Sequence, residues 1–186
     1  KVLFEYFQSA PELGSLLQPS IIESDAFTAN FKELKPVLDQ ALAIESNSEQ
    51  LERGVMASGI AKAGNILSNK YYLVITNVPY LAKGKQGEFL LKYTKKNYIK
   101  SHSDLATVFL DRIFNLLKKS GIITSVTPQN WLYQKTYSDF RFDLLKNKQF
   151  NFVIRLGENA FKSNNAAGAF VSLVSIKNDK GDSNIS

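Results

Sequence analysis

A short turn in the middle of the chain has the residue types needed to bind a flat base that carries an amine. It consists of Asn77, Val78, Pro79 and Tyr80 and directly follows the apolar run Tyr71–Thr76. Asn77 has an amide oxygen, and Pro79 stiffens the turn so that the Val78 carbonyl can face the same space. Two such acceptors bind both hydrogens of an exocyclic amine, which exposes the nitrogen lone pair for attack on an electrophile. Tyr80 offers an aromatic face to the base. An ordinary surface turn has the same composition, and that alternative stays open.

The segments around this turn alternate between strand and helix patterns. Apolar runs rich in β-branched residues predict strands at Tyr71–Thr76, Ile122–Thr127, Phe150–Leu156 and Ala169–Ile176. A helix capped by Ser103 or Asp104 is predicted next, ending at Gly121, with the apolar face Leu105, Val108, Phe109, Ile113, Leu116 and Leu117. A further helix has Phe140, Leu144 and Leu145 on one face. This order predicts an α/β domain with parallel neighbouring strands, and an antiparallel pair at the end because no helix joins the last two strands.

The chain before residue 70 has a helical pattern instead. Apolar residues recur at helical spacing in 34–42 and again in 60–67, with a polar break between them. We therefore expect a helical N-terminal segment over residues 1–69, an α/β domain over 70–177 and a polar tail over 178–186.

Composition excludes several kinds of site. The 186 residues include no Cys, so a disulfide scaffold, a thiolate metal site and a Cys nucleophile are excluded. His102 is the single His, and we expect it to be exposed rather than catalytic. The apolar runs are shorter than the roughly 20 residues of a membrane span, so we expect no membrane partner and a cytoplasmic location. The net charge of +6 is compatible with a polyanionic partner such as nucleic acid.

The turn resembles the Asn-Pro-Pro-Tyr motif of adenine-N6 DNA methyltransferases, with Val78 in place of the first Pro. The resemblance is greatest to the large phage-defence enzymes of the PglX type and to type IIG restriction-modification enzymes. It continues, in the same order and spacing, through Lys92–Tyr98, Ser101–Leu105, Gly121–Leu132 and Tyr137–Arg141. It implies part of a Rossmann-like methyltransferase fold and methyl transfer from S-adenosylmethionine to N6 of adenine in DNA, with no metal. The acceptor at position 78 would be a backbone carbonyl, which Val also has.

The same resemblance implies roles for residues outside the turn. Phe161 would stack on the flipped adenine opposite Tyr80, although it could equally be a core Phe. Asp104 and Leu105 would line the pocket for the cofactor's adenine. Their alternative is structural, with Asp104 capping a helix and Leu105 packing in the core. Trp131 would lie near the target-base pocket, and we assign it no chemical step.

A basic, aromatic-containing loop follows the turn. Its lysines could hold DNA phosphates, although a solvated surface is the default for such a cluster. They are Lys83, Lys85, Lys92, Lys95, Lys96 and Lys100.

The glycine turn that holds S-adenosylmethionine in this family is missing. No two of the 10 glycines are separated by a single residue, so the chain has no Gly-x-Gly. We therefore expect the catalytic-motif half of a methyltransferase domain, which alone neither binds the cofactor tightly nor methylates. Its partners would be DNA and the remainder of the parent chain. An exposed sheet edge would be covered by residues 1–69 or by self-association into a homo-oligomer.

Two other functions remain open at this point. A related turn could act on a different amine, such as that of protein glutamine. The departure at Val78 also leaves room for a catalytically inactive DNA-binding or assembly segment.

Overall fold

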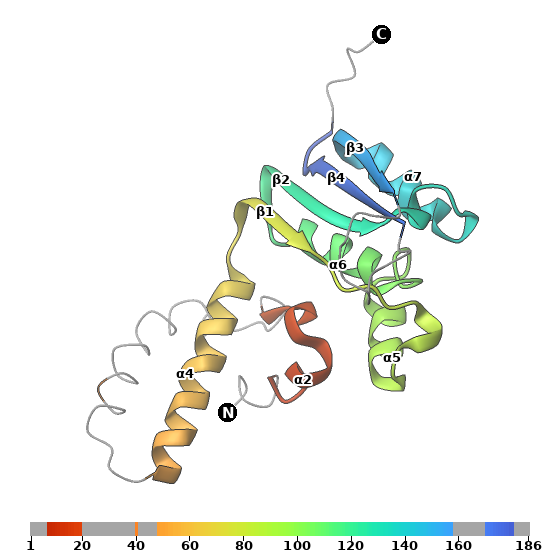
Figure 1. The fold of residues 1–186 in the computed structure, drawn as a ribbon. Coiled ribbons are helices and arrows are strands. Elements are labelled where there is room, and N and C mark those ends of the chain that lie inside the picture. Colours follow the sequence, from red (N-terminus) through yellow and green to blue (C-terminus); the bar gives the residue numbers. More distant parts are fainter. Residues whose placement is uncertain (1–6, 20–39, 41–47, 158–169, 181–186) are drawn as a thin grey trace. The chain divides into compact units, whose positions relative to one another are not determined.

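The computed structural model describes residues 7–19, 40, 48–157 and 170–180 (Figure 1). The chain divides into two compact units, Lys1–Asn69 and Lys70–Ser186. The described elements of the first unit are the short helix α2 (Ala10–Leu13), the 3-10 turn η1 (Gly14–Leu16) and the long helix α4 (Ser48–Ser68). The predicted helical pattern at 60–67 lies within α4, whereas the pattern at 34–42 falls almost entirely outside the described residues.

The second unit is built on a sheet of four described strands in the order β1-β2-β4-β3. Along the chain its elements are β1 (Tyr71–Asn77), η3 (Lys83–Lys85), α5 (Glu88–Asn97), α6 (Leu105–Phe114), β2 (Leu117–Pro128), η4 (Gln129–Leu132), η5 (Lys135–Tyr137), α7 (Ser138–Asn147), β3 (Gln149–Gly157) and β4 (Val171–Lys177). The predicted α/β class, with a helical N-terminal segment, is confirmed.

The pairing of the strands agrees with the prediction at two positions and differs at one. β1 and β2 are parallel, and the last two strands, β3 and β4, are antiparallel, as expected. The expectation that β2 and β3 are parallel neighbours is wrong, because β4 lies between them and is antiparallel to both.

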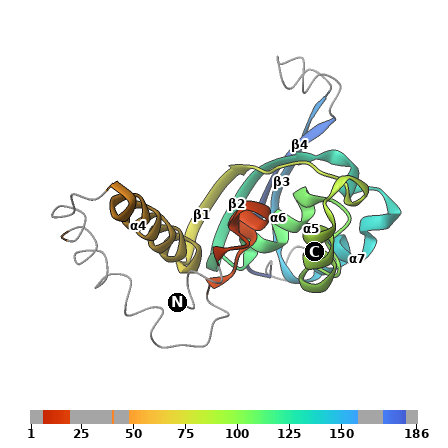
Figure 2. The ribbon, with the colours of Figure 1, turned by 90° about the horizontal axis from the view of Figure 1, so that it is seen from below.

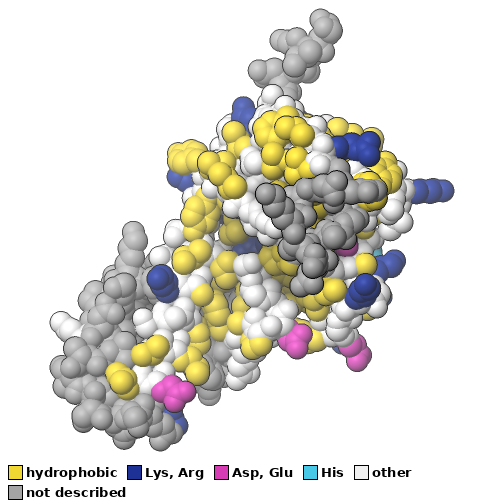
Figure 3. Space-filling model, viewed as in Figure 1, with side chains coloured by type: hydrophobic (Ala, Val, Ile, Leu, Met, Phe, Trp, Pro, Cys, Tyr) yellow, Lys and Arg dark blue, Asp and Glu magenta, His cyan; other side chains and the backbone are white. Residues whose placement is uncertain are grey.

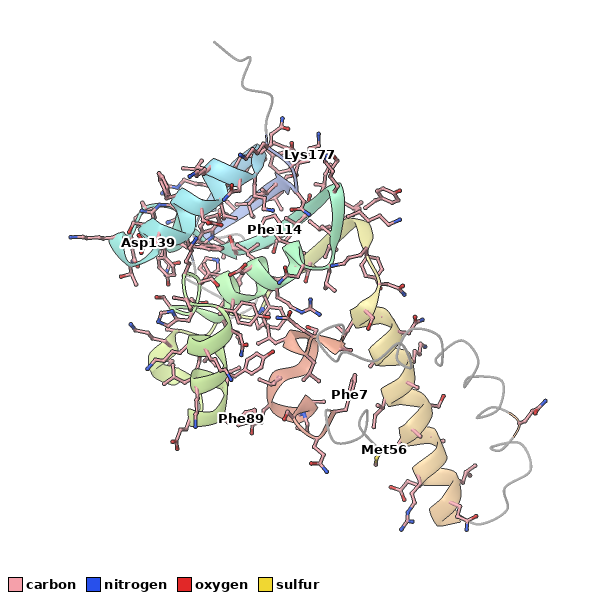
Figure 4. All side chains as sticks on the ribbon, turned by 180° about the vertical axis from the view of Figure 1, so that it is seen from behind. Phe7, Met56, Phe89, Phe114, Asp139 and Lys177 are labelled. Carbon is pink, nitrogen blue, oxygen red and sulfur yellow. The ribbon has the colours of Figure 1, made fainter. Side chains whose placement is uncertain are left out.

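The core of this unit lies on one face of the sheet. Apolar residues of α6 and α7 pack there against alternate residues of β2 and β4. The cluster includes Leu110, Ile113, Phe114, Phe140, Leu144, Ile123, Val174 and Ile176. Figure 2 shows α5 and α6 on the same side of the sheet, and Phe114 is labelled in Figure 4 at the end of α6.

The opposite face of the sheet carries apolar side chains, several of which are exposed in the part of the chain that the structure describes. The strand registers place Ile75 of β1 in line with Thr124, Ser175 and Phe152, so these side chains share that face. Ile75 is 73% exposed, and Leu73, Phe152, Ile154 and Leu156 are also exposed. Figure 3 is viewed from this side and shows hydrophobic side chains gathered over the strands. β1 is the edge strand, because it pairs with β2 alone among the described strands.

The link between α6 and β2 differs from the prediction. The helix ends at Phe114, and Leu117 begins β2 instead of extending the helix. The left-handed residue is Ser120 (φ 61°), not Gly121. Gly121 is required for another reason: a Cβ there would lie 2.9 Å from the Tyr71 carbonyl oxygen, so its hydrogen allows β1 and β2 to approach. In α7, Phe140 and Leu144 are buried as predicted, but Leu145 is 68% exposed.

The close approach of the backbone at Gly121 predicts that adding a single methyl group there lowers the stability of the fold. Gly121→Ala should lower the free energy of unfolding by about 2 kcal/mol, because backbone oxygens cannot move aside as side chains do. Urea denaturation of the purified chain measures this. Gly84→Ala is the matched control: nothing lies within 4 Å of its added Cβ, so the change should stay within about 0.5 kcal/mol. Equal effects of the two substitutions would contradict the packing described here.

Candidate active site

The residues singled out in the sequence lie where three strands end at one edge of the sheet. Asn77, the last residue of β1, is paired with Val126 near the end of β2. Pro128 and Gly157, which end β2 and β3, are both paired with Val171. Ligands of open α/β sheets bind at such carboxyl ends. The turn after Asn77 and the segment after Thr127 therefore start side by side, whereas Phe161 lies outside the described residues.

The turn itself is held by one buried residue between two that face the surface. Val78 is 3% exposed and belongs to the core cluster with Leu110 and Trp131. Asn77 is exposed, and Tyr80 is 36% exposed. The Val78 side chain thus anchors the turn in the core while its neighbours stay accessible.

Asn77 and Tyr80 contact each other directly. The Tyr80 hydroxyl donates a hydrogen bond of 3.1 Å to Asn77 Oδ1. This bond orients the amide so that its oxygen, rather than its NH₂ group, lies on the side of the aromatic ring. An amide oxygen has two acceptor positions, so the oxygen can accept a further hydrogen from a ligand. An amide oxygen beside an aromatic ring suits a flat ligand with an amine on its edge.

Asp104 lies behind the turn, at the start of α6. Its carboxylate accepts the Ala106 N–H at 2.8 Å and so caps the helix, which supports the structural alternative left open by the sequence. Leu105 beside it is buried. Burial raises the pKa of Asp104, and hydrogen bonds from the Ala106 and Leu81 backbone N–H groups act against that rise. Burial and then the nearby Asp104 charge raise the pKa of Tyr80, and the same two causes raise that of Tyr137.

The segment after β2 is rigid. Trp131 is 1% exposed, and its Nε1 donates to Thr127 Oγ1 at 3.0 Å. Its ring meets Phe140 edge to face, with ring centroids 5.9 Å apart. Arg141 donates to the Trp131 carbonyl oxygen at 2.7 Å. The Trp131 side chain is therefore packed in the core at this edge of the sheet. It offers no accessible group for chemistry.

The predicted basic loop forms an exposed surface after the turn. Lys83 and Lys85 lie on η3, and Lys92, Lys95 and Lys96 are exposed on α5. Lys100 is set apart from them, because its ammonium group forms an ion pair with Asp143.

Two contacts at this edge could not be found from the sequence. The Asp104 carboxylate faces the backbone N–H of Leu81, far away in the chain, and the side chain of Gln129 accepts from Arg155 Nε at 2.9 Å. Neither pair has a spacing or motif that signals it. Both depend on which strands become neighbours, and the position of β4 between β2 and β3 was itself not predicted correctly.

Comparison with known proteins shows that this chain is similar to restriction-modification methylases and adenine-specific methyltransferases. Residues 13–161 match the family model described as Eco57I restriction-modification methylase. The adenine-specific methyltransferase BrxX of Escherichia coli O9:H4 (strain HS) is 34% identical over 83% of this chain, and PglX of Lacticaseibacillus casei (strain Zhang) is 30% identical over 73%. The matched parts are 12% and 11% of those relatives, so this chain corresponds to a small part of each.

A solved structure with a weaker likeness is the M protein of the type I restriction enzyme EcoKI. It has a TM-score of 0.44 and 20% identity, covering 62% of this chain and 22% of that chain.

The burial of Trp131 predicts a structural role that stability measurements can separate from chemistry. Trp131→Phe should lower the free energy of unfolding by about 2–3 kcal/mol, since it removes packed volume and the bond to Thr127. Tyr133→Phe, at a side chain that is 63% exposed, is the control and should change it by less than about 0.5 kcal/mol. Thermal unfolding of both variants checks this. An unchanged stability in Trp131→Phe would contradict the role assigned to the ring.

Proposed function

The chain belongs to the Eco57I restriction-modification methylase family, and we propose that it carries the catalytic motif of an enzyme that methylates N6 of adenine in DNA. The observation that carries this proposal is the turn at the carboxyl edge of the sheet, where an exposed amide oxygen lies beside an aromatic ring. The family match and the adenine-specific activity named for BrxX and PglX support it.

The proposed chemistry is polarisation of the adenine amine by two acceptors. Asn77 Oδ1 and the Val78 carbonyl oxygen would each accept one hydrogen of the N6 amine. The nitrogen lone pair would then be withdrawn from conjugation with the ring and become nucleophilic. The Tyr80 ring would stack on one face of the flipped base and Phe161 on the other, which returns part of the stacking lost when the base leaves the duplex.

We propose that the residues of this chain do not by themselves hold S-adenosylmethionine. The sequence has no Gly-x-Gly turn. Asp104 and Leu105, expected near the cofactor's adenine, are buried, and the Asp104 carboxylate already accepts backbone N–H groups within the protein. The methyl donor of the family would be held by residues that this chain does not contain.

DNA is the proposed partner, and the exposed lysines of η3 and α5 supply the positive charge for its phosphates. No helix among the described residues is both long and apolar enough to cross a membrane.

A single substitution at the turn tests the proposed function. In the full-length protein, Asn77→Ala should lower the methylation rate by at least about a hundredfold, because one of the two acceptors is lost. DNA affinity should stay within about twofold, since phosphate contacts dominate it. Transfer of labelled methyl groups and a DNA-binding titration measure the two quantities.

Asn97→Ala is the matched control for this experiment. Asn97 lies exposed on α5, and its side chain donates to the Tyr93 carbonyl oxygen, outside the turn. Its rate should equal that of the wild type. If Asn77→Ala methylates DNA as fast as the control, the amide is not an acceptor for the amine and the proposed function fails.

The missing glycine turn leads to a second prediction about the chain alone. The isolated 186-residue chain should show no methyl transfer to DNA and no tight binding of S-adenosylmethionine. Isothermal titration with the cofactor and an assay with labelled donor test this. Robust turnover by the isolated chain would show that its residues are sufficient and would overturn this part of the proposal.

A further inference from the structure

The end of the turn is attached to the start of α6 by a short antiparallel bridge. Ala82 pairs with Asp104 as an isolated bridge. The Leu105 N–H donates to the Leu81 carbonyl oxygen at 2.9 Å, and the Lys83 N–H donates to the Ser103 carbonyl oxygen at 3.1 Å. The residue directly after Tyr80 is therefore tied to a helix that begins more than twenty positions later.

The Asp104 side chain strengthens this bridge from the inside. A helix-capping carboxylate normally accepts N–H groups of its own helix, as Asp104 does from Ala106. The backbone N–H of Leu81 also faces this carboxylate and lowers its pKa. This buried side chain therefore lies against both the first turn of α6 and the residue that follows the Asn77–Tyr80 turn.

The turn is consequently held at two points. Val78 is anchored in the core beside residues of α6, and Leu81 is held by Asp104 and Leu105 at the start of the same helix. Tyr80 lies between these two anchors, and its hydroxyl bonds Asn77. A change in the second anchor would shift Tyr80 and, through it, the direction of the Asn77 amide.

We propose that Asp104 is a positioning residue, which fixes the Asn77–Tyr80 turn by joining its end to the N-terminus of α6. This inference rests on the proposed function, because the turn must present its oxygens to the substrate amine for the fixed position to matter.

The substitution Asp104→Asn separates this role from helix capping. The amide keeps one oxygen, so it can still accept the Ala106 N–H. Its NH₂ group accepts no hydrogen bond, so the substitution removes one of the two acceptor oxygens together with the negative charge that faces the Leu81 N–H. In the full-length protein we expect kcat for methylation to fall roughly tenfold or more, with KM for DNA within about twofold, because the turn is misplaced while phosphate contacts remain. Asp104→Ser, which also retains a capping oxygen, should behave in the same way.

Hydrogen exchange of the same variants supplies a readout that a purely stabilising role would not give. Amides of residues 80–83 should exchange faster in Asp104→Asn, while those within 105–114 keep their protection. Asp111→Asn is the matched control, since Asp111 is a partly buried carboxylate on the same helix that accepts from Ser101 Oγ at 2.7 Å, outside the bridge. It should leave kcat and the exchange of 80–83 unchanged.

Each outcome decides the inference. A wild-type kcat in Asp104→Asn overturns it, as does a loss of kcat that is equalled in Asp111→Asn or accompanied by faster exchange throughout α6. Asn77→Ala in the same protein distinguishes a failure of the positioning role from a failure of the proposed function. If Asn77→Ala is inactive and Asp104→Asn is fully active, only the positioning role fails, whereas an active Asn77→Ala removes the proposed function and the inference together.

Discussion

The whole site depends on the burial of one side chain between two exposed ones. Val78 packs in the core cluster of the second unit, whereas Asn77 before it and Tyr80 after it face the surface. A buried Val has few positions available to it, so it fixes the backbone from which the neighbouring polar groups project. Under the proposed function the residue at 78 acts through its backbone carbonyl, and a side chain that packs well keeps that group in place.

The turn follows β1, which is an edge strand among the described strands, and contacts on one side of β1 keep it in place. β1 has a neighbour on one side only and an apolar face with little cover among the described residues, so it lacks much of the support that a central strand receives. The parallel pairing with β2, the close contact at Gly121 and the bridge from Leu81 to Leu105 hold it instead. These contacts all connect β1 to the helix and strand that follow it in the chain.

The sequence predicted the elements and the turn well, but it could not predict contacts between distant residues. β-branched runs and the capping residue Asp104 are local signals, and the strands and the start of α6 lie close to where those signals placed them. The end of α6 was predicted too late, because Leu116 and Leu117 continue the helical spacing and Gly121 resembles a helix stop. Their actual places depend on pairing with β1, as does the position of β4 between β2 and β3. The second partner of Asp104 was missed for the same reason.

The most direct test of the account is a structure of the full-length protein bound to DNA that contains its target adenine. The account predicts a flipped adenine on the Tyr80 ring, with N6 within about 2.7–3.2 Å of both Asn77 Oδ1 and the Val78 carbonyl oxygen. An adenine bound elsewhere, or an N6 amine that contacts neither oxygen, would contradict the role assigned to this turn.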